Sequence, residues 1–342
     1  MGGFWAWGMH GIDLFFVISG FIMAQVHWQD FKQGTGWRRF LVSRVSRIYA
    51  PYWPVLAVLV IAYFVMPAVG SESGRAVRDT TTIIRSALLL PATDGVVPVA
   101  WTLEHEIVFY SIVLVALIRP FIGVMVFMGW QLHALTAGHV GTVTSDHAKF
   151  FMGPYEIEFA FGIACMLILR TFPTTRYPRL ILVAGTSLFF AIALYSTYIH
   201  DFIPVSFSST VSYGIASSIV LLGAIYCEQT GHLRIPKLAV FLGGASYSIY
   251  LVHYPCISLF SKALGRFGLT APQLVDVGMI GLSATAIIAG CAYHMVAERP
   301  LTAISRAWLA RALALRSVSP GTHVAIVADL GSGDTPQMHP VR

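Results

Sequence analysis

Ionisable side chains stand inside three apolar stretches of the sequence, where removal of charge from water is costly. The stretches and their ionisable residues are GIDLFFVISGFIM with Asp13, VAWTLEHEIVFY with Glu104, His105 and Glu106, and PYEIEFAFGI with Glu156 and Glu158. Carboxyl and imidazole groups in such surroundings are suited to proton transfer, ion relay or substrate binding. They are the first candidates for a functional site.

Helical geometry limits how the second stretch is used. Neighbouring residues on a helix are about 100° apart, so Glu104, His105 and Glu106 are not expected to face one interior together. We predict that one of the two glutamates is exposed or interfacial. The order HEIVF resembles the start of a zinc-protease motif, but Phe109 stands where the second His is required, so no metal site is predicted.

The third stretch places two carboxylates two residues apart. Glu156 and Glu158 therefore point to different helix faces, which argues against a proton shared between them. We expect one of them to pair with a buried Arg or with Lys149. A substrate-facing role is the alternative.

A basic segment, RRFLVSRVSRIYAPYW, leads into an apolar block at Pro51. Arg44 and Arg47 are three residues apart and share a helix face, at a depth where a phosphate group could bind. The functional interpretation is a site for a phosphorylated cofactor reached from the cytoplasm. The alternative is electrostatic anchoring with an interfacial Tyr/Trp belt.

Two further motifs carry histidine. GGASYSIYLVHYPCISLF contains His253, for which hydrogen-bonded packing is the alternative to catalysis, and YHMVAERP ends in a predicted capping ion pair before Pro300. No phosphate loop, GxSxG elbow, dinucleotide fingerprint or metal-spaced His/Cys set occurs in the sequence. The chemistry must therefore be assembled from several helices.

The elements that position these residues follow from composition. The 342 residues are 56% hydrophobic and 11% charged, whereas soluble domains have roughly 25% charged residues. Long unbroken apolar blocks indicate helices rather than barrel strands. We predict an all-α, polytopic helical membrane protein with nine spans, near 11–28, 50–69, 100–118, 120–136, 150–169, 179–198, 207–226, 238–260 and 273–296.

Lys and Arg are distributed unequally between alternate loops. Sixteen of the 22 lie on one side, which the positive-inside rule assigns to the cytoplasm together with the C-terminus. Basic cytoplasmic loops explain the net charge of +6 without a nucleic-acid partner. Because residues 1–10 are then outside with no signal peptide or preceding helix, we expect a tenth helix to be missing at the N-terminus.

The chain divides into a transmembrane domain at 1–302, an interfacial amphipathic helix at 303–317 and a disordered cytoplasmic tail at 318–342. The helix is predicted from the spacing of Arg306, Arg311 and Arg316 among Ala, Leu and Trp. The four cysteines form no CxxC pair and are expected to be helix packing residues.

Six patterns in order resemble the membrane acyltransferase-3 family, in its exopolysaccharide-production branch. They are GIDLFFVISGFIM, RVSRIYAPYW, VAWTLEHEIVFY, EFAFGI, ASYSIYLVHYP and AERPLT, which together cover residues 11 to about 302. The resemblance implies a ten-helix enzyme of the bacterial inner membrane. Such an enzyme transfers an acyl group, usually acetyl from acetyl-CoA, to a hydroxyl of a polysaccharide or a lipid-linked sugar.

The resemblance also implies site roles. Catalytic candidates are Glu106, which matches the family's W-S/T-L-x-x-E pattern, His253, which matches its SYSxYLxH element, and His10. The family's first helix carries an Arg and a His proposed as general base, and this sequence has neither, so His10 or His253 would have to substitute. Cofactor binding is assigned to Arg44, Arg47, Tyr49 and Ser19, and substrate binding to Asp13, Trp101, Glu158 and Tyr110.

Two other function classes fit the same residues. A transporter or flippase for a glycan or acyl donor would use Glu106 and Glu158 as relay groups. A non-catalytic subunit of a polysaccharide assembly complex is suggested by the abrupt start. The sequence does not identify the acyl group, the acceptor sugar or the oligomeric state.

Overall fold

The computed structural model of the chain describes residues 7–65, 78–91, 95–140, 154–198, 206–266 and 275–313. All regular structure in these ranges is helical, which confirms the predicted all-α class. The elements are η1 (Trp7–His10), α2 (Gly11–Val26), α3 (Trp28–Gln33), α4 (Trp37–Val65), α6 (Thr80–Leu88), η3 (Pro98–Ala100), α7 (Trp101–Ile118), α8 (Pro120–Val140), α10 (Glu156–Thr171), α11 (Pro178–Tyr198), α12 (Phe207–Gln229), α13 (Lys237–Arg266), α14 (Val275–Tyr293), the π-turn η5 (His294–Glu298) and α15 (Arg299–Ala312).

Several helices are long and apolar enough to cross a membrane. Among the described residues six spans meet this condition: Gly8–Val26, Trp37–Val65, Pro98–Ile118, Pro178–Ser196, Phe207–Gln229 and Ile280–Ala312. Each of the nine predicted spans also overlaps a helix in the described part of the chain. Exposed Phe, Leu, Ile and Val side chains on α8 and α11 are suited to contact with lipid. The protein is therefore a polytopic helical membrane protein.

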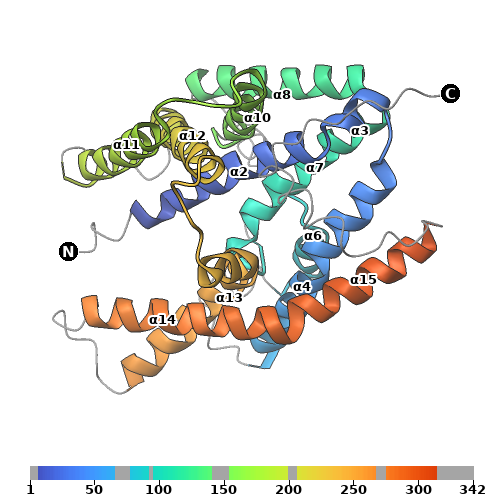
Figure 1. Cartoon of the computed structure of the whole chain (residues 1–342). Helices are drawn as coiled ribbons and strands as arrows, with labels where there is room; N and C mark the ends of the chain where they lie inside the picture. The colour runs from blue at the N-terminus through green and yellow to red at the C-terminus, as the bar shows by residue number, and fades with distance from the viewer. Residues whose placement is uncertain are drawn as a thin grey trace.

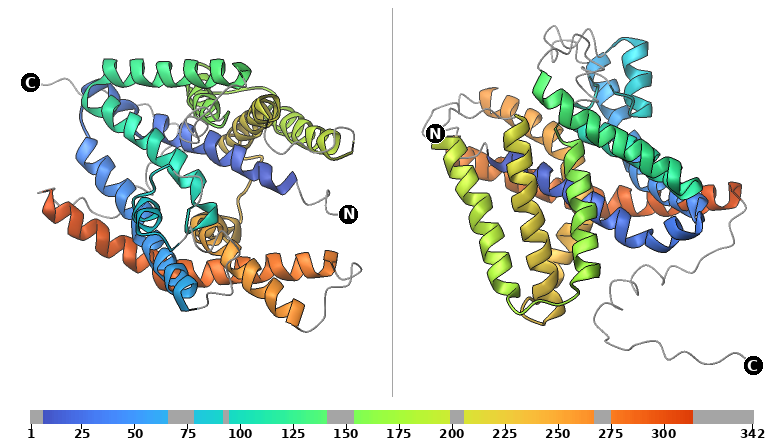
Figure 2. Two further views of the ribbon diagram at one scale, coloured as in Figure 1. Left: turned by 180° about the vertical axis from the view of Figure 1, so that it is seen from behind. Right: turned by 90° about the horizontal axis from the view of Figure 1, so that it is seen from above.

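The helices form two groups around a central pair. Helices α2 and α7 run through the middle of the molecule, with α10, α11 and α12 side by side on one flank and α4, α13, α14 and α15 on the other (Figures 1 and 2). Helix α2 packs against both α10 and α12, and α15 packs against α4. The buried side chains of α2 and α7 therefore lie near the centre of the bundle.

Helix α4 differs from the predicted span at its start. The sequence placed this start near residue 50, at Pro51, but the helix begins at Trp37 and contains both Pro51 and Pro54. Proline lacks the backbone N–H that a helix interior uses, and hydroxyl groups of neighbouring helices bond to other backbone carbonyls in these turns. The Tyr247 hydroxyl donates to the Ile48 carbonyl at 2.9 Å, and the Tyr293 hydroxyl donates to the Pro51 carbonyl at 2.6 Å.

Helix α6 packs against the middle turns of α4. Helix α6, predicted as part of a loop, folds back against them, where the Tyr52 hydroxyl donates to the Ser86 carbonyl at 2.8 Å and the Trp53 indole to the Ala87 carbonyl at 2.9 Å. Because α4 begins at Trp37, Arg44 and Arg47 lie two to three turns inside this helix and not at its start.

Helices α2 and α10 cross in close contact. A Cβ atom at Gly162 would overlap the Val17 carbonyl oxygen, and one at Gly20 would overlap the carbonyl oxygen of Phe159. Glycine at both positions lets the two backbones approach, as small residues do at helix crossings in membranes. This contact brings Asp13 of α2 beside the carboxylates of α10.

The last two helices form one continuous rod. Helix α14 passes through the π-turn η5 into α15, which packs against α4. The amphipathic helix predicted at 303–317 is described as far as Leu313, within and just after α15, and its remainder, like the predicted tail at 318–342, lies outside the described residues.

Candidate functional site

Helix α7 is buried around its circumference at its first turns. Glu104, His105 and Glu106 are 3%, 4% and 6% exposed. The prediction that one of the two glutamates is exposed or interfacial is therefore wrong. Residues 100° apart all find cover because α7 is central and meets helices on several sides.

Glu106 lies in a polar cluster formed by α2, α4 and α7. The Tyr110 hydroxyl donates a short hydrogen bond to the Glu106 carboxylate, and the Ser19 side chain lies beside that carboxylate. The guanidinium carbon of Arg44 lies 5.4 Å from the centre of the Tyr110 ring. Arg44 and Arg47 both act electrostatically on Glu106. Five predicted site residues therefore converge here: Ser19, Arg44, Arg47, Glu106 and Tyr110.

The two arginines differ in environment. Arg44 is half-buried, and its Nε atom is fully buried without a hydrogen-bond partner in the described part of the chain. Arg47 is exposed. A buried, unpaired guanidinium donor is costly unless a ligand completes it, and phosphate oxygens match its geometry.

Tyr49 is directed away from this cluster. Its hydroxyl donates to the Leu88 carbonyl of α6 at 3.0 Å, and its ring packs on Trp53. Of the four residues assigned to cofactor binding, it is the one that the structure places against a different element.

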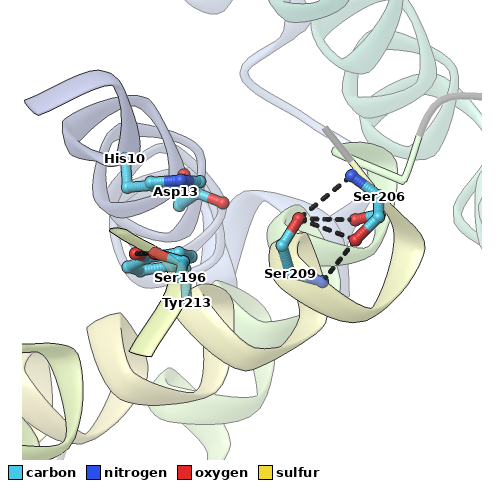
Figure 3. Close-up of polar contacts among 6 residues, drawn as sticks. All are labelled: His10, Asp13, Ser196, Ser206, Ser209 and Tyr213. Atoms are coloured by element: carbon cyan, nitrogen blue, oxygen red, sulfur yellow. Dashed lines mark hydrogen bonds and ion pairs between the residues drawn. The ribbon is translucent and has the colours of Figure 1, made fainter. Parts of the chain in front are cut away.

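A second cluster lies near the N-terminal end of α2. His10 Nδ1 and Asp13 Oδ2 are 3.0 Å apart, and both side chains are buried. The His10 ring stacks on Tyr213 of α12 with ring centres 3.5 Å apart and an interplanar angle of 11°. Figure 3 shows Asp13 beside His10 and Tyr213 beside Ser196, its partner at 3.2 Å.

The carboxylates of α10 take different partners, as their helix faces require. Glu156 Oε1 lies 3.1 Å from His105 Nδ1, whereas Glu158 faces Asp13. The expected pairing with a buried Arg is therefore wrong for Glu156, since a histidine of α7 occupies that place, and Lys149 lies outside the described residues. The absence of a dyad between Glu156 and Glu158 themselves agrees with the sequence-based argument.

Aromatic rings join the two clusters. Trp101 packs against Tyr155 with ring centres 5.2 Å apart and meets His105 edge to face at 5.8 Å. Phe16 contacts both Tyr155 and His105. Trp101 is half-buried, so part of its indole ring remains accessible.

His253 belongs to neither cluster. Its Nδ1 atom lies 2.5 Å from the Tyr250 carbonyl oxygen, and the ring packs on Tyr250. The Tyr250 hydroxyl in turn donates to the Val99 carbonyl at 2.9 Å and accepts from Thr102 at 2.8 Å. These contacts fit the packing interpretation of this histidine.

The structure adds polar residues that sequence reasoning did not select. Tyr213 lies in none of the quoted motifs, and Tyr155 stands in PYEIEFAFGI but was not selected. Their position between helices reveals both. The predicted capping pair at YHMVAERP is a buried network: Glu298 accepts from Ser248 at 2.6 Å and from His294 at 2.7 Å, and Arg299 donates to His294 at 3.1 Å. The unusual density of His, Glu and Arg was its sequence signal.

The fold and these clusters define a class, a helical membrane protein with a buried site of acids, imidazoles and a guanidinium group. The model of the acyltransferase domain matches residues 2–295, and the chain belongs to this family, acyltransferase-3. The chain is 31% identical over 315 residues to the exopolysaccharide production protein ExoZ of Rhizobium meliloti (strain 1021), covering 88% of this chain and 91% of that protein. No solved structure is significantly similar to it. The protein is thus a multi-pass membrane acyltransferase.

Proposed function

We propose that this protein transfers an acyl group, acetyl in the first instance, from acyl-CoA to a hydroxyl of an exported polysaccharide or of its lipid-linked precursor. The family supports the acyl transfer, and the relative that bears the name of exopolysaccharide production supports the acceptor class. The same proposal places the enzyme in the bacterial inner membrane with its C-terminus in the cytoplasm.

One observation carries the donor assignment: the buried Nε of Arg44 lacks a partner among the described residues, beside Tyr110 and Glu106. CoA carries phosphates that accept strong charge-assisted bonds from guanidinium groups. Arg44 and Arg47 bind these phosphates, and Glu106 fixes the guanidinium groups through their mutual attraction. Arg44 therefore contributes chiefly to donor affinity.

The acceptor binds at the second cluster. Trp101 and Tyr155 offer aromatic faces suited to the apolar face of a sugar, and Asp13 and Glu158 offer carboxyl oxygens suited to its hydroxyls. The two clusters lie on one helix, α2, since Ser19 contacts Glu106 while Asp13 faces Glu158. In this proposal, donor and acceptor bind at two different positions along α2.

The test uses the full chain in lipid nanodiscs, acetyl-CoA labelled in its acetyl group and the polysaccharide of a producing strain. Covalent label on the glycan supports acyl transfer. Movement of unmodified glycan or donor across the bilayer, without label on the glycan, contradicts it and identifies a transporter.

Variants locate the donor site in the same assay. Arg44→Ala is expected to raise the donor KM about tenfold or more, because a hydrogen bond to a charged group is worth about 1.5–3 kcal/mol. Arg38→Ala is the matched control, because Arg38 is exposed on the same helix and its guanidinium lies over the Trp37 ring. An equal donor KM for both variants would refute the donor assignment.

A further inference from the structure

We propose that Arg306 of α15 is a third arginine of the donor site and binds the 3′-phosphate of CoA, beside Arg44 and Arg47 of α4. This inference rests on the proposed acyl-CoA donor and adds a residue that recognises one phosphate of that donor. Three observations support it: the packing of α15 on α4, the face of α15 that carries Arg306, and the charges and unsatisfied donors where the two helices meet.

Helix α15 packs on α4 at the turn that carries the two arginines (Figure 1). The Ser305 hydroxyl donates to the Ser46 hydroxyl at 3.4 Å. Ser46 is fully buried and stands between Arg44 and Arg47 in the sequence. Arg306 directly follows Ser305, so its side chain begins next to this contact between the helices.

The two arginines of α15 lie on different faces of that helix. Ile304 and Trp308 are 65% and 68% exposed and share one face, which is suited to contact with lipid. At about 100° per residue, Arg306 is about 180° from the middle of this face, whereas Arg311 is within about 40° of it. The sequence assigned both arginines to the membrane interface. The structure leaves Arg311 on the lipid-facing side and places Arg306 on the opposite side.

Three guanidinium groups therefore meet where α4 and α15 pack together. Arg44 and Arg47 both act electrostatically on Arg306. Among the described residues, none of the three arginines forms an ion pair with a carboxylate. Like charges in one place repel each other and attract an anion of matching charge. A ligand with several phosphate groups satisfies this condition.

The same two helices also carry unsatisfied hydrogen-bond donors. The Nε atom of Arg44 and the Oγ1 atom of Thr302 are buried without a hydrogen-bond partner in the described part of the chain. Thr302 is four residues before Arg306 and shares its face of α15. Buried donors without a partner are costly, and phosphate oxygens accept strong bonds from guanidinium and hydroxyl groups. Both helices thus offer donors to a phosphorylated ligand.

The exposure of the arginines indicates which phosphate each one binds. CoA carries a diphosphate joined to its pantetheine arm and a separate phosphate at the 3′ position of its ribose. Arg44 is half-buried beside the Tyr110 ring, whereas Arg306 is exposed. Because the thioester must reach into the bundle, the diphosphate lies at the inner arginine. The ribose 3′-phosphate then lies at Arg306.

The experiment compares CoA with dephospho-CoA, which lacks the 3′-phosphate, by isothermal titration of the full chain in phosphatidylcholine nanodiscs. The wild type is expected to bind CoA about tenfold more tightly, as loss of one charge-assisted hydrogen bond predicts. Arg306→Ala should bind the two ligands within about twofold of each other, because the partner of the 3′-phosphate is gone. Arg311→Ala, the matched control on the lipid-facing side of the same helix, should keep the preference of the wild type.

The preference is a ratio of two Kd values measured on the same variant. A lower fraction of folded protein would reduce both titrations equally, so it cannot imitate the loss of preference. The phosphate of an anionic lipid headgroup is the other source of the same chemistry. Native mass spectrometry should therefore find equal retention of phosphatidylglycerol by Arg306→Ala and Arg311→Ala. Loss of this lipid from Arg306→Ala alone, with its preference for CoA intact, would assign Arg306 to a headgroup and refute the proposal.

The outcomes separate this inference from the proposed function. The same preference for CoA in Arg306→Ala and Arg311→Ala refutes the assignment of Arg306, while CoA binding and labelled glycan still support acyl transfer from CoA. A wild type that binds CoA and dephospho-CoA equally refutes recognition of the 3′-phosphate. A wild type that binds neither ligand refutes the proposed donor and this inference with it.

Discussion

Buried polar side chains in this protein are used in pairs, several of which join different helices. Glu106 bonds to Tyr110 one turn away on α7 and lies beside Ser19 of α2, His105 approaches Glu156 on α10, and Asp13 faces Glu158. An unpaired carboxylate at such depth is costly. Removal of one partner should therefore lower the free energy of unfolding.

The Tyr110 hydroxyl provides the first test at the scale of single residues. Tyr110→Phe removes a donor from the buried Glu106 carboxylate and is expected to lower the free energy of unfolding by about 1–3 kcal/mol. SDS titration of the protein in mixed micelles measures this. Tyr254→Phe is the control, because Tyr254 is 46% exposed, and equal stability of the two variants would show that the Glu106 bond contributes nothing.

The His105–Glu156 pair is tested by a double-mutant cycle. His105→Gln, Glu156→Gln and the double variant should give a coupling energy of about 0.5–3 kcal/mol, because residues in contact are not additive. The same unfolding titration supplies all four values. Additive effects would mean that the 3.1 Å approach of the two side chains carries no interaction energy.

At the scale of elements, the crossing of α2 and α10 decides the second cluster. Gly20 and Gly162 leave no room for a Cβ atom at the crossing, so the two backbones are in direct contact there. The close crossing brings Asp13 to Glu158. A change in the separation of the two helices should therefore disturb both stability and transfer.

Gly162→Ala tests this crossing. The added methyl group must displace the Val17 carbonyl region, and overpacking of this kind costs about 1–3 kcal/mol. Gly129→Ala on α8 is the matched control, because nothing lies within 4 Å of its added Cβ atom, so stability should stay constant or rise by up to about 1 kcal/mol. A Gly162→Ala protein as stable as Gly129→Ala would contradict the close crossing.

At the scale of the whole molecule, the proposed orientation in the membrane rests on the distribution of charge. Helix α11 joins a loop with Arg176 and an N-terminal Arg179 to a segment at 199–206 that has no Lys or Arg. From the positive-inside rule we expect Thr175 to lie in the cytoplasm and Ser208, at the start of α12, on the outer side.

Cysteine labelling in whole cells tests this orientation. In a chain whose four native cysteines are replaced, Ser208→Cys should react with a membrane-impermeant maleimide in intact cells, and Thr175→Cys only after permeabilisation. Ser208 is exposed and Thr175 is partly exposed, so access to reagent is the variable. The reverse pattern would invert the proposed topology.

The sequence by itself determined the helical membrane class, the positions of the apolar helices and the residues that are expensive to bury. These properties depend on local composition, because each span must satisfy its backbone within its own helix. The ordered motifs also identified the family.

Only the tertiary structure decided what surrounds each residue. Helical periodicity predicts which residues share a face but not how many faces are covered, and so the burial of Glu104, His105 and Glu106 together was missed. The structure also showed that α4 starts before Pro51. The His105–Glu156 pair and the stack of His10 on Tyr213 each join residues from separate helices. Such contacts arise from packing between segments distant in sequence, where no local pattern records the partner.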